Sequence, residues 1–449
     1  MSRSSRKRPP RRPPRLRNRY VGAVRTGTDQ AVRQGRVMTL NERRRSCWVA
    51  LAVGAGGVVL CAGSAHAQAG GGMPSAGGAQ KPFTVDVIGA ILYDSNAARG
   101  QDQIAVARDL HKSEVTYSPS VLVTVNRPLG RNLVFLSAAG GYDFHKYNKQ
   151  LESGRVDVSG GGMARLGPCG LSLTGGYAVR QSDLEDLPLR VTRNRQTTRS
   201  VAAQTSCFVG TGLTGFLGVS ASDTSNSADF NLVDSDSVSL NGGFGYGNRR
   251  LGTVQVIGGY TRSSYGESAN PLVRNQPGFN AYNIGLQYSR EIGNRLSGNA
   301  SITYQTVDSS DPLIGSSSNL SGTGALDYRL NSRMGLNLIY SRGAAPSIVE
   351  GYDYILDESV GLSARYSLSS RIQSSFGARW AKTDYKGRTQ VLLDVPTDER
   401  TRALFAQVSM QLGRTATVSL NVNQTKRTSN PDVFDYTAYQ VGVTAKKSF

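Results

Sequence analysis

Most of this chain divides into segments of about ten residues in which apolar and polar side chains alternate. A two-residue period is that of a β-strand with one apolar face, and it excludes amphipathic helices as the main element. Short turn sequences recur about every forty residues, and each interval holds two strands joined by a longer polar connection. These turns lie near residues 128–130, 167–170, 210–212, 247–249, 293–295, 331–333, 369–371 and 413–415.

The turns set the expected number of strands. Eight turns delimit sixteen strands, and segments near 83–93 and 436–449 add one at each end. We therefore expect an all-β fold over residues 81–449, an antiparallel β-barrel of about 18 strands, with 16 as the alternative count. A β-propeller also repeats about every forty residues, but its blade packs four strands into the period where this chain has two.

Aromatic residues recur in one strand phase and at two heights. Since Tyr and Trp settle at bilayer interfaces, this face is expected to meet lipid, in a transmembrane barrel with short periplasmic turns and longer extracellular loops. Only alternate residues then need to be apolar, which explains a hydrophobic content of 38%. One predicted girdle holds Tyr246, Tyr288, Tyr328 and Tyr366, and the other holds Tyr177, Tyr260, Tyr304, Tyr340 and Trp380.

The opposite strand phase is polar, which predicts a hydrated channel wall. Arg180, Arg329, Arg365 and Arg379 fall in this inward phase, against Asp157 and Asp327 as the clearest inward acids. A positive excess would concentrate anions; the alternative is that the arginines pair with wall carboxylates and brace the barrel. The polar lining is expected to include Ser172, Thr174, Ser239, Asn241, Asn283, Gln287, Asn299, Ser301, Thr303, Ser321, Thr323, Asn337, Ser363, Gln407, Ser409, Asn421 and Asn423.

The last strand alternates up to an aromatic carboxyl terminus. Tyr439, Val441, Val443 and Phe449 share one face, and the residues between them are polar or small. This ending looks like the signal that the assembly machinery of bacterial outer-membrane barrels reads on a terminal strand. Outer-membrane lipid, lipopolysaccharide and that machinery are the expected partners.

The amino-terminal region resembles a secretory signal. Three arginines at 43–45 precede an apolar run and the small residues 65–67, which predicts a signal peptide over residues 38–67, cleaved before Gln68. Residues 1–37 are read as an over-extended start or basic leader, and residues 68–80 as a flexible linker. The formal net charge of +20 includes +11 in residues 1–37 and +2 in residues 38–67, so +7 remains afterwards. A nucleic-acid partner is therefore not expected.

Two cysteines, Cys169 and Cys207, remain after the signal peptide. They suit opposite strands of one hairpin, and we expect a disulfide near its periplasmic base, with two free thiols as the alternative. His111 and His145 are the remaining histidines, and neither lies in a hydrolase motif, so no enzyme, cofactor or metal site is expected. The charged connection 182–198 is a candidate constriction, although a solvated surface loop is the more frequent outcome.

Tyr93-Asp94-Ser95-Asn96 directly follows the first strand and precedes a polar stretch and the strand 115–125. In this motif and in strand layout from Phe83 to Phe449, the chain resembles the outer-membrane β-barrel porin family often called BBP2. The resemblance implies a part in exopolysaccharide export, with polysaccharide and periplasmic export proteins as partners. We expect a channel for hydrophilic, anionic solutes or polysaccharide. A general or anion-preferring nutrient porin and a structural barrel with a closed lumen are the alternatives.

Overall fold

The computed structural model describes residues 82–182, 184, 193–208, 212–227, 232–248, 250–266, 278–310, 315–347, 352–387 and 397–449. The predicted leader, signal peptide, cleavage site and linker lie outside the described residues, as does most of the charged connection after residue 182. Within the described part of the chain, no helix is long and apolar enough to cross a membrane.

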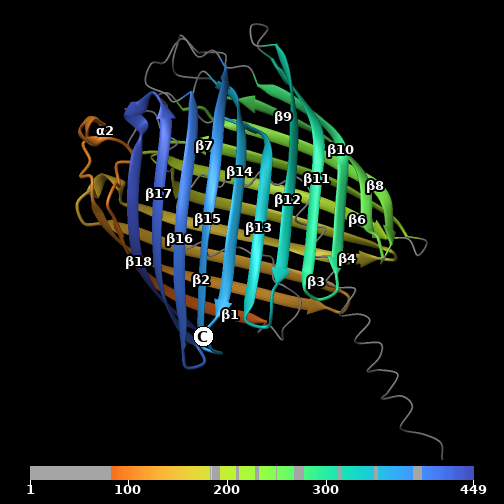
Figure 1. The fold of residues 1–449 in the computed structure, drawn as a ribbon, viewed down its shortest axis with the longest axis horizontal. Helices are drawn as coiled ribbons and strands as arrows, with labels where there is room; N and C mark the ends of the chain where they lie inside the picture. The colour runs from red at the N-terminus through yellow and green to blue at the C-terminus, as the bar shows by residue number, and fades with distance from the viewer. Residues whose placement is uncertain are drawn as a thin grey trace, which may run out of the picture. The chain divides into compact units, whose positions relative to one another are not determined.

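The described residues form 18 antiparallel strands in a single sheet (Figure 1). They are β1 Phe83–Asp94, β2 Glu114–Leu129, β3 Asn132–His145, β4 Ser153–Leu166, β5 Cys169–Gln181, β6 Arg195–Phe208, β7 Leu213–Asn226, β8 Ser235–Asn248, β9 Gly252–Tyr265, β10 Phe279–Ile292, β11 Leu296–Ser309, β12 Ser316–Arg329, β13 Met334–Pro346, β14 Tyr352–Ser367, β15 Ile372–Gly387, β16 Asp398–Leu412, β17 Ala416–Asn430 and β18 Tyr436–Ser448.

The sheet closes because its first and last strands pair with each other. β1 pairs with β18 from Asp86↔Ser448 to Asp94↔Gln440, and each remaining strand pairs with its neighbours in the chain. Closure removes the exposed strand edges that an open sheet would present. The predicted all-β barrel is confirmed, and 18 is the correct strand count rather than 16.

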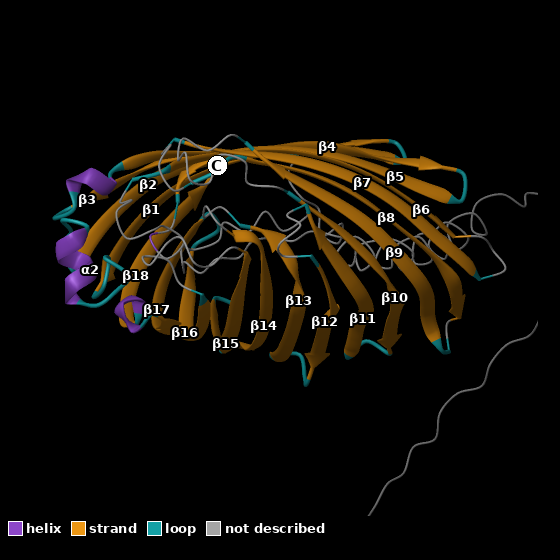
Figure 2. Cartoon of the chain, turned by 90° about the horizontal axis from the view of Figure 1, so that it is seen from above, coloured by secondary structure: helices purple, strands orange, loops and turns teal. Residues whose placement is uncertain are grey.

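The two ends of the barrel differ in the length of their connections. Short turns join β2 to β3, β4 to β5 and so on, and we call their side the short-turn end. The longer connections hold the described helical turns, which are α2 (Asp102–Ala107), η1 (Lys149–Leu151) and η3 (Asp432–Phe434). Figure 2, seen from above, shows these helices beside the wall of strands.

The two faces of the sheet differ in chemistry, as the alternation requires. On β10, Tyr282, Ile284, Leu286 and Tyr288 share the outer face and are 40–63% exposed. Gln287 points to the other face and is only 5% exposed although it is polar. Apolar side chains outside and buried polar side chains inside reverse the usual arrangement of a water-soluble protein, and they fit a barrel with lipid around it and water within it.

Candidate permeation pathway

The inner wall is lined by hydrogen-bonded hydroxyl and amide side chains. Four cross-strand hydroxyl pairs, each with an O···O distance of 2.9 Å, follow the inward phase. Buried amides fill the spaces between them: the Oε1 of Gln305 accepts from the Ser321 hydroxyl at 2.7 Å. Such a wall offers partners to water along its whole length. The hydroxyl pairs are Ser239–Thr261, Ser301–Thr323, Ser341–Ser359 and Ser409–Ser419.

The four inward arginines do not all lie at one height and do not form one ring. Arg329 and Arg365 lie at the short-turn end, each directly opposite Gly335 on the strand between them. Arg180 lies at the other end of the barrel, one residue before the end of β5. Arg379 interacts electrostatically with Asp357 across two neighbouring strands.

Three of these arginines have no carboxylate partner among the residues that the structure describes. Among the described residues, no ion pair within 4.0 Å involves Arg180, Arg329 or Arg365. The inward Asp327 instead accepts a hydrogen bond of 2.9 Å from the Asn337 amide. The wall-brace interpretation thus fits Arg379; for the other three arginines, the described residues include no carboxylate that would play this part.

Two ion pairs at the long-connection end are buried. The carboxylate of Asp94 lies 2.7 Å from Arg99 Nη2 and accepts a second bond of 2.7 Å from Gln440. Arg427 is 1% exposed and forms an ion pair with Glu399. Buried pairs of this kind hold the wall in one arrangement and add little net charge to the lumen.

Glu114, the first residue of β2, links this strand to the connection between β3 and β4. Its carboxylate is 1% exposed and accepts from the backbone N–H groups of Val115, Lys146, Tyr147 and Asn148 at 2.7–3.1 Å. Four donors satisfy the buried charge and fix the β3–β4 connection against β2. His145 lies 3.7 Å from the same carboxylate, which gives this histidine a structural contact.

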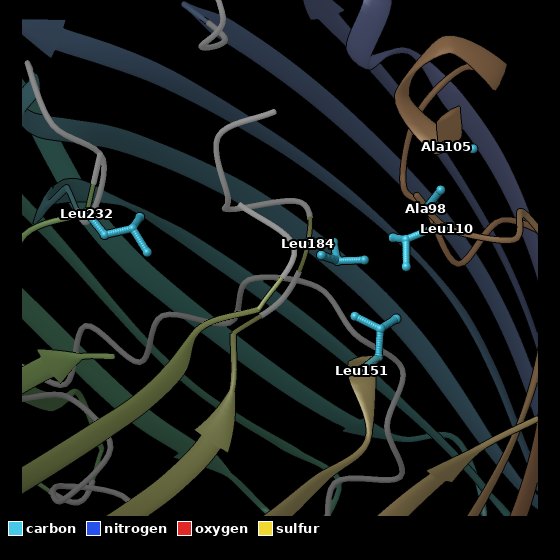
Figure 3. Close-up of a cluster of buried hydrophobic side chains, with 6 residues drawn as sticks. All are labelled: Ala98, Ala105, Leu110, Leu151, Leu184 and Leu232. Carbon is cyan, nitrogen blue, oxygen red and sulfur yellow. The ribbon is translucent and has the colours of Figure 1, made fainter. Parts of the chain in front are cut away.

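The connections at this end also share a small apolar core. Ala98, Ala105, Leu110, Leu151, Leu184 and Leu232 form one buried cluster. Figure 3 shows Leu110, Leu151 and Leu184 pointing toward one another from three different connections. Leu184 is the one described residue of the charged connection between 183 and 192, and it lies in this cluster at 7% exposure.

The ends of β13 and β14 fold inward over the lumen. Pairing between β12 and β13 stops at Gly322↔Arg342, although β12 begins at Ser316 and β13 continues to Pro346. Beyond that point the wall turns in, so that Tyr354 packs on Phe279 with ring centroids 5.8 Å apart. We call residues 343–347 and 352–356 the inward tip.

Polar contacts fasten the inward tip to the inner faces of β9 to β12. The Tyr265 hydroxyl donates to the Asp353 carbonyl at 2.5 Å and accepts from the Ser347 N–H at 3.0 Å. The Ser317 and Tyr354 hydroxyls lie 2.5 Å apart. The sequence pattern gave no sign of these contacts.

The predicted girdle residues lie in the outer phase of their strands. Tyr246, Tyr288, Tyr328 and Tyr366 are 39–52% exposed near the short turns. Toward the other end, Tyr304 is 57% and Tyr177 41% exposed, while Tyr260, Tyr340 and Trp380 are half-buried. Tyr93, Tyr117 and Tyr142 are exposed in the same way and were not predicted.

Cys169 and Cys207 face each other across β5 and β6 and form a disulfide with an S–S distance of 2.03 Å. Tyr439, Val441 and Val443 are 43–53% exposed on the outer face of β18. The N–H of Phe449 donates to the Val85 carbonyl at 2.9 Å, so the last residue takes part in closing the barrel.

A closed barrel with an apolar outer band, tyrosines at both borders and a polar inner wall defines a porin-like protein of the bacterial outer membrane. The short-turn end is then periplasmic and the long-connection end extracellular. Residues 273–449, which hold β10 to β18, match the family described as "Putative beta-barrel porin 2". The resemblance expected from the strand layout is confirmed over these residues, which do not include the first strand or Tyr93-Asp94-Ser95-Asn96.

Solved outer-membrane proteins resemble the chain at low identity. OccK2 (OpdF) of Pseudomonas aeruginosa is 13% identical with a TM-score of 0.44, and the match covers 82% of this chain and 97% of that one. OpdK of the same species is 13% identical with a TM-score of 0.43, covering 82% and 99%. A BenF-like porin of Pseudomonas fluorescens is 10% identical with a TM-score of 0.45, covering 83% and 100%. No curated protein sequence matches the chain.

Proposed function

We propose that this protein is an outer-membrane channel that passes hydrophilic, anionic solutes or polysaccharide by diffusion. The observation that carries the proposal is the inner wall, which is polar along its length and holds three arginines without carboxylate partners within the described part of the chain. Fixed positive charge in a water-filled pore raises the local concentration of anions.

A part in exopolysaccharide export is the more specific form of this proposal, and it rests on the family resemblance. A polysaccharide presents hydroxyl groups at every unit, and a wall of Ser, Thr, Asn and Gln side chains can exchange hydrogen bonds with them as water does. A nutrient channel for anions would use the same wall, so the direction of transport decides between the two.

Liposome swelling tests the proposal directly. Proteoliposomes should admit glucuronate faster than glucose, which is similar in size but neutral, and R180Q/R329Q/R365Q should abolish that preference. The matched control R199Q removes an outward arginine that pairs with Asp223 at 3.5 Å, and it should leave the preference intact. Barrels that are folded yet admit neither sugar would refute the open channel and favour the structural alternative.

A further inference from the structure

The periplasmic end of the lumen contains a polar cavity of about 450 Å³. Three neighbouring hairpins build it, β12–β13, β14–β15 and β16–β17, and the first two contribute residues of their short turns. Two arginines, Arg333 and Arg371, line it without any carboxylate. The rest of the lining is hydroxyl and amide except for one isoleucine: Ser367, Ser369, Ser370, Ile372, Gln373, Ser409, Gln411 and Thr417.

Backbone hydrogen bonds hold the two arginines in place. The Ser367 N–H donates to the Arg333 carbonyl at 2.8 Å, and the Gln411 N–H donates to the Arg371 carbonyl at 2.8 Å. Each turn is also closed by a side chain, because Asn331 Oδ1 accepts from the Arg333 N–H at 2.8 Å and Ser369 Oγ accepts from the Arg371 N–H at 3.2 Å. The three hairpins are therefore joined to one another.

The guanidinium groups themselves remain available. Both arginines are exposed, and the described residues include no acid within 4.0 Å of either group. The lining residues Ser367, Gln373, Ser409, Gln411 and Thr417 lie in the inward strand phase, so the cavity opens toward the lumen. Arg365 lies two residues before Ser367 on the same face and continues the positive charge into the pore.

Basic residues also surround the cavity along the periplasmic rim. Arg131, Arg250 and Arg295 are exposed on three other short turns, and Arg414 is exposed on the turn between β16 and β17. The acids at this end include Glu291, Asp327 and Asp86, and Asp86 is paired with Lys446 at 2.7 Å. The rim therefore attracts anions from the periplasm toward the cavity.

We propose that this cavity binds anionic sugar units as they enter the pore from the periplasm. A guanidinium group fits a carboxylate bidentately, and the surrounding hydroxyls and amides match sugar hydroxyls in both donor and acceptor roles. This inference rests on the proposed function for the direction of transport, because binding at the periplasmic end assists export.

Calorimetry on the folded protein in detergent tests the site without requiring permeation. Hexagalacturonate should bind, and R333Q/R371Q should weaken its binding at least tenfold. The matched control R131Q/R250Q removes the same charge from the same rim and should change the affinity less than threefold. R333K/R371K keeps the charge but loses the bidentate fork, and its affinity should fall between wild type and R333Q/R371Q.

Two results would overturn the site: equal weakening in both Gln double variants, or equally tight binding of neutral maltohexaose. Competition by inorganic phosphate as strong as by the oligosaccharide would also refute it, because a bare anion site needs no sugar. A barrel that binds hexagalacturonate here but conducts nothing would refute the channel and leave the site standing.

Discussion

Replacing Tyr265 by Phe should loosen the inward tip while keeping the aromatic ring. The substitution removes two hydrogen bonds, one to the Asp353 carbonyl at 2.5 Å and one from the Ser347 N–H at 3.0 Å. Each is worth about 0.5–1.5 kcal/mol, so the docked tip should lose about 1–3 kcal/mol relative to an undocked one. That difference raises the undocked population about 5- to 150-fold.

Single-channel recording measures this change. If the tip narrows the lumen, Tyr265→Phe should increase the occupancy of a wider conductance state by a factor in that range. Phe279→Ala removes the ring that packs on Tyr354 and should act more strongly, because truncating a buried Phe costs about 3–5 kcal/mol. Tyr304→Phe is the matched control, since its ring is 57% exposed on the outer face.

The reasoning fails if folded Tyr265→Phe and Phe279→Ala barrels both give the wild-type conductance histogram. The inward tip would then be a stabilising contact that does not limit permeation. Migration as a heat-modifiable band shows that each variant is folded, so loss of the barrel cannot be mistaken for an open pore.

Three further predictions concern maturation and assembly. Amino-terminal sequencing of the outer-membrane form should begin at or near Gln68, and a mature form retaining residues 1–37 would contradict the signal peptide. Deleting Phe449 removes the bond to Val85 and should lower the amount of folded barrel without affecting secretion; unchanged assembly would make the ending incidental. C169S/C207S opens a cross-link with a sequence separation of 38 and should lower unfolding stability by up to about 4 kcal/mol, whereas an unaltered heat-modification temperature would show that the disulfide adds nothing.

The barrel could be predicted because its determinants are local. Two-residue alternation sets the face of each side chain, and several strands end at a turn that holds a glycine at positive φ, such as Gly293 (60°). The inward phase of Arg329 and Arg365 follows from the same rule. That Arg329 and Arg365 lie at the same height does not follow from the alternation. It depends on the register of β12 and β14 against Gly335 of β13.

The inward tip could not be predicted because it depends on contacts between distant segments. Tyr354 lies in the strand phase that faces lipid elsewhere on β14. It points inward because the wall bends there, and it packs on Phe279 and hydrogen-bonds to Ser317. The periplasmic cavity was missed for a similar reason. Each turn could be recognised in the sequence. Arg333 and Arg371 lie in one cavity, however, because backbone hydrogen bonds join neighbouring hairpins.

The reversal potential of the wild-type channel under a KCl gradient tests the central claim most directly. An open pore lined by inward arginines should show anion preference, and R180Q/R329Q/R365Q/R379Q should shift the potential toward cations. Screening over about 8 Å at physiological ionic strength means that the preference should decrease as the salt concentration rises. A folded barrel that conducts nothing, or a preference that is indifferent to these four substitutions, would contradict the account.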